Sequence, residues 1–196
     1  MIAAAEVFRV FQAHRDDAIV IPSGTAGRHW RDVSANERRD LALGGAMGQT
    51  TAAALGVALG LPHERVVVFD AEGALLMNLG VLATIAGKRP RNFYHFLLDN
   101  ECYATTGGQP VPNAQNIDYA GLAQAAGYAA AYRFDELEPF GAQVGDILRE
   151  PGPVFVAVKV IPEVENAPIG LRQRRPSRSR AETIRELRHE LGIPTR

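Results

Sequence analysis

The chain has 196 residues, of which 46% are hydrophobic, so it is long enough for one domain with a substantial core and short for two. Its formal net charge of -1 argues against a protein that binds nucleic acid through bulk positive charge. A single cysteine excludes an intrachain disulfide and a zinc site made of cysteines alone. The sequence shows no signal-peptide pattern and no uninterrupted apolar run of about 18 residues, so we expect a cytoplasmic protein that does not span a membrane.

The first third of the chain predicts a helix, a strand and a second helix. Apolar residues at helical spacing predict a helix over residues 6–11, and a short apolar run predicts a strand over residues 18–21. The small-residue segment 23–27, which includes Thr25, is equally compatible with an ordinary turn and with a loop that approaches a phosphate. A glycine-rich turn then precedes a small-residue helix that we expect over residues 49–60.

Strands and helices alternate through the rest of the chain as far as residue 160. Short apolar runs predict buried strands, and apolar residues at helical spacing predict the helices between them. This alternation indicates an α/β fold, a doubly wound, mainly parallel sheet with helices on both faces. The expected strands are 66–69, 94–98, 129–132 and 154–160, the expected helices are 73–87, 118–128 and 136–148, and a loop occupies residues 105–116.

The composition changes after Pro162, where arginines crowd a stretch rich in Pro and Ser before a helix expected over residues 181–191. We therefore divide the chain into a domain of residues 1–162 and a C-terminal arm of residues 163–196, which packs on the domain or on a neighbouring subunit. Because the chain as a whole is not basic, we interpret these arginines as salt-bridge partners and not as a nucleic-acid site. They are Arg172, Arg174, Arg175, Arg178 and Arg180.

Polar clusters follow two of the expected strands at the point where each strand ends. Residues 70–73 read Asp-Ala-Glu-Gly, and residues 99–103 read Asp-Asn-Glu-Cys-Tyr. Ligands of open α/β sheets bind outside the carboxyl ends of the strands. A carboxylate and an amide oxygen suit a hard cation and the phosphate that this cation neutralises. We therefore expect a cation and phosphate site at this edge of the sheet.

Three motifs in this order resemble the diphosphate-binding domain of thiamine diphosphate enzymes. GAMG precedes the small-residue helix, DAEGALLMNLG follows the strand at 66–69, and LDNECYATTGGQ closes the strand at 94–98. The similarity covers residues 1–162 and is greatest to the sulfopyruvate and phosphonopyruvate decarboxylases. It implies the thiamine diphosphate-binding fold, thiamine diphosphate and Mg2+ as cofactors, and decarboxylation of a small anionic 2-oxo acid such as sulfopyruvate or phosphonopyruvate.

The resemblance implies a set of metal ligands at the two strand ends. Glu72 stands at the position of the family's metal-binding Asp, and Asn100 stands at that of its amide ligand. The main-chain carbonyl of Cys102 is the expected third protein ligand. Two diphosphate oxygens and a water would complete the octahedron that Mg2+ requires. We interpret Cys102 as this backbone ligand and not as a nucleophile, because no His lies near it in sequence.

The metal motif also departs from the family pattern. Where the family has Gly-Asp-Gly followed by Ser or Thr, this chain has Ala71, Glu72, Gly73 and Ala74. Glu is one methylene longer than Asp, so its carboxylate overshoots the metal unless the loop shifts. A non-catalytic paralogue, a binding or scaffolding subunit with a weakened metal site, is therefore the alternative interpretation.

The resemblance further implies which residues contact the organic cofactor. Met47 matches the bulky apolar residue that keeps the cofactor bent. Main-chain groups of Gly45 and Ala46 would contact its pyrimidine ring, and those of Gly73 and Ala74 would donate to its diphosphate. The full expected set is Thr25, Gly45, Ala46, Met47, Gly73, Ala74, Asn100 and Tyr103.

Other polar residues have two interpretations each. Thr106 faces the substrate or caps its own loop, and His29, with Arg28 in the loop after the first strand, could face an anionic substrate. Asp70 is a rival metal ligand that we expect to cap or pair structurally. His95 lies in an apolar strand, which favours a core or interface histidine over a catalytic one.

No residue of this chain is identified as the catalytic acid or base. The family's reaction needs a Glu from a separate pyrimidine-binding domain, for which a chain of this length has no room. The resemblance therefore implies an α subunit that supplies this Glu within a homo- or hetero-oligomer, and a chain that is inactive alone. A nucleotide-binding Rossmann domain is less favoured, because no G-x-G-x-x-G follows the first strand.

Overall fold

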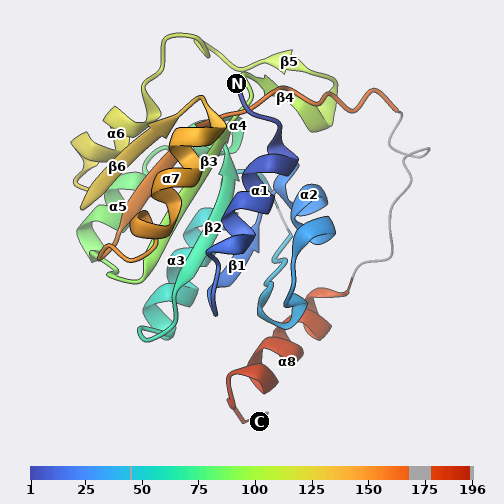
Figure 1. Ribbon diagram of the computed structural model, residues 1–196, viewed down its shortest axis with the longest axis vertical. Coiled ribbons are helices and arrows are strands. Elements are labelled where there is room, and N and C mark those ends of the chain that lie inside the picture. The colour runs from blue at the N-terminus through green and yellow to red at the C-terminus, as the bar shows by residue number, and fades with distance from the viewer. Residues whose placement is uncertain (45, 168–177, 195–196) are drawn as a thin grey trace.

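A five-stranded parallel sheet forms the centre of the computed structural model, which describes residues 1–44, 46–167 and 178–194. The strand order across the sheet is β1-β2-β3-β7-β6, and each neighbouring pair is parallel (Figure 1). The strands are β1 (Ile19–Pro22), β2 (Val66–Ala71), β3 (Phe93–Asp99), β6 (Ala130–Phe134) and β7 (Val154–Lys159).

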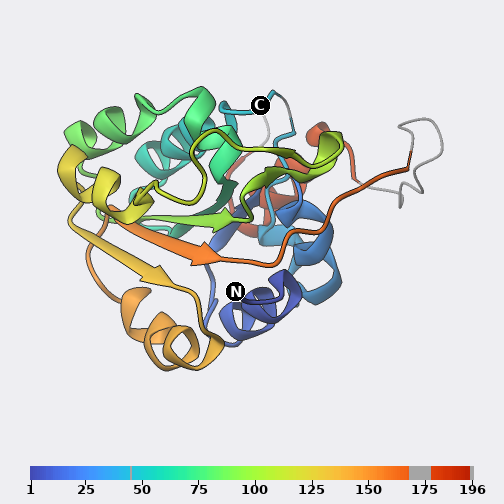
Figure 2. The same cartoon turned by 90° about the horizontal axis from the view of Figure 1, so that it is seen from above.

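Helices cover both faces of this sheet, as Figure 2 shows. One hydrophobic cluster joins the sheet to α1, α2 and α7, and a second joins it to α3, α4, α5 and α6. The predicted fold class, a doubly wound, mainly parallel sheet with helices on both faces, is confirmed. The helices are α1 (Ala4–Ala13), α2 (Ala26–Val33), α3 (Thr50–Gly60), α4 (Glu72–Met77), α5 (Val81–Lys88), α6 (Tyr119–Ala126) and α7 (Leu137–Ile147).

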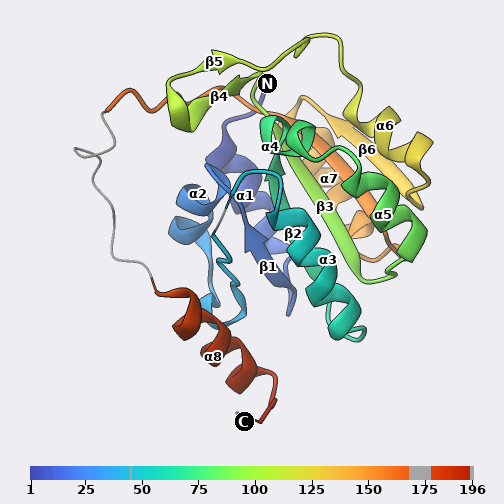
Figure 3. The ribbon, with the colours of Figure 1, turned by 180° about the vertical axis from the view of Figure 1, so that it is seen from behind.

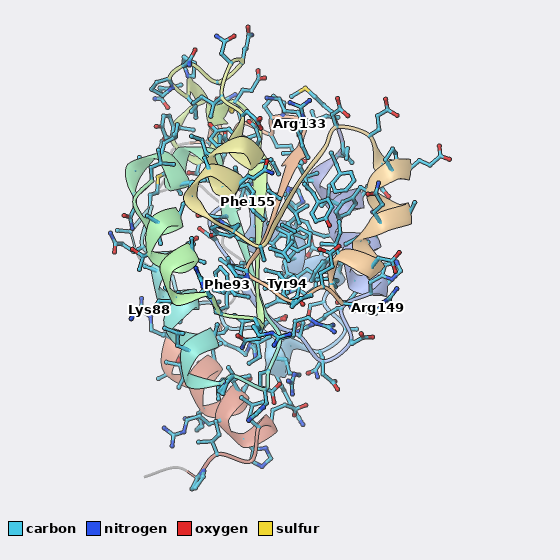
Figure 4. The ribbon with its side chains drawn as sticks, turned by 90° about the vertical axis from the view of Figure 1, so that its left-hand side faces the viewer. Lys88, Phe93, Tyr94, Arg133, Arg149 and Phe155 are labelled. Atoms are coloured by element: carbon cyan, nitrogen blue, oxygen red, sulfur yellow. The ribbon has the colours of Figure 1, made fainter. Side chains whose placement is uncertain are left out.

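The central strand β3 explains why the sheet needs a helical layer on each face. All seven of its residues are buried, and neighbouring side chains point to opposite faces. Tyr94 belongs to the cluster with α1 and α7, whereas Phe93 belongs, with Phe155 of β7, to the cluster with α5 and α6 (Figure 4). The apolar runs recognised in the sequence are therefore strands that lie between two cores.

The expected continuous helix over residues 73–87 is wrong. The chain forms α4 and α5 instead, and Asn78, between them, has a non-helical backbone with φ -145° and ψ 51°. Its side-chain nitrogen donates a hydrogen bond of 2.8 Å to the main-chain oxygen of Gly48. An Asn side chain that bonds to a backbone group outside its own helix competes with helix continuation, and Gly80 adds a second residue of low helix propensity.

Two expected loops also contain regular structure. Arg28 and His29 do not lie in a loop but on the helix α2. The loop expected at 105–116 contains a 3-10 helix, η2 (Ala104–Thr106), and a short strand, β5 (Gln109–Pro110), which pairs antiparallel with β4 (Cys102–Tyr103). The elements β4, η2 and β5 have two or three residues each, too few to produce a periodic sequence pattern.

The described parts of the C-terminal arm contact the rest of the chain at both ends of the molecule. Arg28 forms an ion pair of 2.6 Å with Glu165, near the carboxyl edge of the sheet. At the opposite end of the molecule (Figure 3), α8 (Arg180–Glu190) packs on the 3-10 helix η1 (Glu37–Arg39) and buries Leu187. Arg178 pairs with Glu37 and Glu186 of the same chain. The other arginines of the arm's Pro- and Ser-rich stretch, Arg172, Arg174 and Arg175, lie outside the described residues, whereas Arg180 begins α8.

No helix among the described residues has the length and apolar character needed to cross a lipid bilayer.

A buried ion pair next to β1 provides a test of this fold. The Arg15 Nη2 atom lies 2.6 Å from Asp40 Oδ1, and the two side chains are 1% and 8% exposed. We expect Asp40→Ala to lower the free energy of unfolding by about 3–5 kcal/mol in urea denaturation, because it leaves a buried guanidinium without its carboxylate. As a control, Asp146→Ala removes an exposed pair with Arg149 and should cost about 0.5 kcal/mol or less. Equal losses in the two variants would contradict the assignment.

Candidate functional site

The pairing of β2 with β3 places two polar segments at the same edge of the sheet. Ala71, the last residue of β2, is the register partner of Leu98 in β3, so Glu72 and Asn100 follow at the same level. The chain leaves β1 toward α2 on one face and leaves β2 toward α4 on the other. Neighbouring strands whose connections diverge in this way create a crevice, which is where open α/β sheets bind ligands.

The Glu72 carboxylate is fully buried at this crevice. Within the described part of the chain, neither of its oxygens has a hydrogen-bond partner. The pKa of Glu72 is raised from 4.5 to about 7, mainly by burial and also by the charge of Asp99; the main-chain N–H groups of Glu72, Asn100 and Cys102 lie near enough to oppose part of this rise, although none has the geometry of a hydrogen bond to the carboxylate. A buried carboxylate without a partner is costly, so this group needs a proton or a cation.

Asn100 and Cys102 lie in a tight turn beside Glu72. The Asn100 Oδ1 atom accepts a 3.1 Å hydrogen bond from the Cys102 main-chain nitrogen, and Glu101 between them has a left-handed φ of 63°. Burial, followed by the charges of Glu72 and Glu101, raises the pKa of the Cys102 thiol. A thiol with a raised pKa is a poor nucleophile, which favours a main-chain role for this residue.

These groups fit the hard cation that the sequence implies. An unpartnered carboxylate and an amide oxygen with a remaining lone pair are ligands that suit Mg2+. Among the described residues, no group of three or more His, Cys, Asp or Glu side chains could hold a metal, so main-chain and ligand oxygens would have to complete the coordination. Ala71 has φ -123°, an ordinary extended conformation, so Ala replaces the family's Gly there without backbone strain.

A pocket with about 670 Å³ of empty space, open to solvent, adjoins these residues. It is lined by small-residue loops, which allow the backbone to approach a ligand closely. Ser23, Gly24, Thr50 and Thr105 also line it. Ser23 and Gly24 had a sequence signal in the small-residue loop after β1, Thr105 had one in the motif LDNECYATTGGQ, and Thr50 had none. Gly45 lies outside the described residues. The expected cofactor residues that line the pocket are Thr25, Ala46, Met47, Gly73, Ala74, Asn100 and Tyr103.

The ring of Tyr103 lies directly against Gly73. A Cβ atom at residue 73 would lie 2.5 Å from the Tyr103 ring, which is closer than real Cβ atoms approach a neighbour. This contact explains why the position needs Gly, independently of φ. It also places an aromatic side chain at the start of α4.

Neither weak catalytic candidate lines this pocket. The His29 Nε2 atom lies 2.9 Å from Glu163 Oε2 in the C-terminal arm, and His29 lines a separate, adjoining cavity. The Thr106 hydroxyl donates a 3.3 Å hydrogen bond to the main-chain oxygen of Tyr103, so it is bonded within its own loop. Both side chains therefore have contacts that do not involve a ligand.

Asp70 and His95 form a buried polar cluster behind the pocket. Asp70 accepts hydrogen bonds from the Thr51 hydroxyl at 2.6 Å and from the Ala71 main-chain nitrogen at 2.9 Å. His95 is fully buried, and its Nδ1 atom lies 3.2 Å from the Tyr128 hydroxyl. The two residues have the structural contacts that the sequence favoured for them.

A family comparison explains why these residues lie together. The family described as "Thiamine pyrophosphate enzyme, C-terminal TPP binding domain" matches residues 23–158, which begin directly after β1 and include β2 to β6 and all of β7 except Lys159. The chain belongs to this family. Thiamine pyrophosphate is another name for thiamine diphosphate, so the family is the one indicated by the sequence motifs.

Curated relatives of this TPP-binding domain fall into two groups by length. The sulfopyruvate decarboxylase subunit beta of Methanothermobacter thermautotrophicus is 35% identical over 161 residues, which cover 82% of this chain and 83% of that protein. The phosphonopyruvate decarboxylase of Streptomyces viridochromogenes is 35% identical over 150 residues, or 76% of this chain and 36% of that protein. The chain therefore spans about a third of the phosphonopyruvate decarboxylases that it matches.

Solved structures show the same fold for this TPP-binding domain. Benzoylformate decarboxylase from Polynucleobacter necessarius superimposes with a TM-score of 0.70 at 16% identity, over 82% of this chain and 33% of that one. A protein from Mycobacterium smegmatis, described as a "putative thiamin diphosphate-dependent enzyme", superimposes with a TM-score of 0.69 at 21% identity, over 82% of this chain and 32% of that one.

The unpartnered Glu72 carboxylate predicts a pH-dependent stability of the metal-free chain. Because its folded pKa is raised, the stability that this group contributes is present below pH 4.5 and is lost as the pH rises through 7. We therefore expect the stability of Glu72→Gln, measured relative to the unaltered chain, to increase by on the order of 3 kcal/mol from pH 5 to pH 8. Thermal melts in the presence of a chelator measure this difference.

The exposed Glu138 supplies the matched control for this measurement. Glu138→Gln removes a carboxylate that is already in contact with water, so it should not produce a gain in stability comparable to that of Glu72→Gln. A Glu72→Gln difference that is independent of pH would contradict the buried, proton-binding carboxylate.

Proposed function

We propose that this chain is the diphosphate-binding subunit of a thiamine diphosphate- and Mg2+-dependent decarboxylase of small anionic 2-oxo acids, such as sulfopyruvate or phosphonopyruvate. The observation that carries the proposal is the unpartnered, buried Glu72 carboxylate next to Asn100, which lines a pocket together with Met47 and the small-residue loops. Family membership and the names of the curated relatives support it.

Each residue of the site has a distinct task in this proposal. Glu72, Asn100 and the main-chain carbonyl of Cys102 would hold Mg2+, which neutralises the diphosphate. Main-chain N–H groups of Gly73 and Ala74 would donate to the diphosphate oxygens. When bound, thiamine diphosphate supplies the carbon nucleophile and the electron sink for loss of carbon dioxide.

Met47 would support the bent cofactor from the other side of the pocket. The tasks of this chain are therefore to bind the cofactor, to orient it and to neutralise its charge. None of these residues moves a proton, so the proton-transfer groups must come from elsewhere in the assembly.

The active form in this proposal contains a second chain. The relatives named phosphonopyruvate decarboxylase are about three times as long as the segment they share with this chain, whereas a relative named as a beta subunit is matched over 83% of its length. We infer that a companion α subunit supplies the pyrimidine-binding half, with its catalytic Glu, and part of the substrate pocket. The assembly is then a homo- or hetero-oligomer in which the cofactor lies between chains.

A non-catalytic paralogue remains the second candidate, because Glu72 replaces the family's Asp and Ala74 replaces its Ser or Thr. In that case the chain keeps the fold and serves as a binding or scaffolding subunit. The two proposals differ in cofactor affinity, which can be measured directly.

Calorimetric titration with thiamine diphosphate and Mg2+ tests the metal assignment. Glu72→Asp should keep or improve the affinity, because Asp is the family's residue and still supplies a carboxylate. Glu72→Ala should weaken it by about thirtyfold or more, because the only anionic protein ligand is lost. Glu138→Ala, an exposed change of the same kind, should leave it unaltered. The same affinity in every variant would refute the role of Glu72.

Isolation of the native assembly tests the enzymatic part of the proposal. We expect carbon dioxide release from sulfopyruvate or phosphonopyruvate when thiamine diphosphate and Mg2+ are present, and none from this chain alone, because the pyrimidine-binding half is missing. Pyruvate, which lacks the second anionic group, serves as the control substrate and should react more slowly. Absence of cofactor binding with and without the companion chain would favour the paralogue.

A further inference from the structure

The two sides of the pocket come from different parts of the chain. One side is the turn before α3, which carries Met47. The other side is formed by Ala71 at the end of β2 and by Gly73 and Ala74 at the start of α4. Met47 is 40% exposed, so burial in the core does not hold its turn in place. Its position relative to the metal loop therefore depends on specific contacts between the two segments.

One such contact is the hydrogen bond from Asn78 to Gly48, the residue after Met47. The Asn78 Nδ2 atom lies 2.8 Å from the Gly48 main-chain oxygen. Gly48 has a φ of +79°, and a Cβ atom there would lie 3.2 Å from the main-chain oxygen of Ala74 and 3.3 Å from the Cβ of Met77. The turn thus lies directly on α4, at a separation that suits glycine.

A second contact joins the same two segments just after the turn, at the start of α3. The Thr51 hydroxyl, in the first turn of α3, donates a 2.6 Å hydrogen bond to Asp70, and Asp70 accepts the Ala71 main-chain N–H at 2.9 Å. Thr51 and Asp70 are 1% and 2% exposed, so water does not compete for this bond. The chain that follows Met47 is therefore fixed to the metal loop at two points, Gly48 and Thr51, and the bond from Asn78 is the one nearer to Met47.

We propose that Asn78 is a positioning residue for the cofactor, and that its side-chain amide sets the separation between Met47 and the Glu72 loop. Asn78 does not line the pocket, so it acts through Gly48. The inference rests on the proposed function. It distinguishes two kinds of ligand: thiamine diphosphate spans both sides of the pocket and needs the fixed separation, whereas Mg2+ with inorganic pyrophosphate uses only the Glu72 side.

The test compares these two ligands by calorimetry on the full chain, in the assembly with which it is isolated. We expect Asn78→Ala to weaken thiamine diphosphate binding by about tenfold, the usual effect of leaving a buried acceptor unpaired, and pyrophosphate binding by less than about twofold. Asn116→Ala is the matched control, because within the described ranges of the chain its side chain donates to the exposed Asn113 alone. It should change neither affinity.

The outcomes separate the positioning role of Asn78 from the proposed function of the chain. Equal weakening of both ligands in Asn78→Ala would show a general loss of stability and overturn the positioning role. If the unaltered assembly binds neither ligand, the proposed function itself fails, and the inference with it. Gly48→Ala provides a second variant in case Asn78→Ala does not fold, because its Cβ would push the turn away from Ala74 and should produce the same selective loss.

Discussion

The parallel pairing of β2 with β3 is the constraint on which the site depends. Both strands lie inside the sheet and are buried on both faces, so their register cannot slip without moving side chains out of the two cores. Because Asp70 pairs with Leu97 and Ala71 with Leu98, the segments that follow the strands emerge at one level. Glu72 and Asn100 are adjacent for that reason, although they are far apart in the sequence.

The same arrangement leaves a carboxylate in an apolar place. Glu72 is fully buried, and its pKa near 7 reflects the cost of removing its charge from water. The extra methylene of Glu relative to Asp has not brought the carboxylate out to solvent. Sites that bind cations are often unstable when empty, because the charges that attract the ion repel one another or lack partners without it.

Around this buried carboxylate, the pocket wall is assembled from segments distant in sequence. The turn with Met47 is fixed by Asn78 and Thr51, and the hairpin β4–β5 carries Tyr103 onto Gly73. Family membership accounts for the fold and for the pocket, and the relatives matched over a third of their length show that this fold is one part of larger enzymes. In the proposed function, this chain supplies one half of a site.

The sequence by itself determined the fold class and the two strand ends where the site lies, because fully buried parallel strands are continuous apolar runs and the motifs follow them directly. Only the tertiary structure decided the break after α4, the helix that carries His29 and the shape of the pocket. The break in the helix depends on the hydrogen bond between Asn78 and Gly48, and the His29 side chain lies 2.9 Å from Glu163. Contacts between residues so distant leave no periodic pattern in the chain, so no local reading of the sequence could find them.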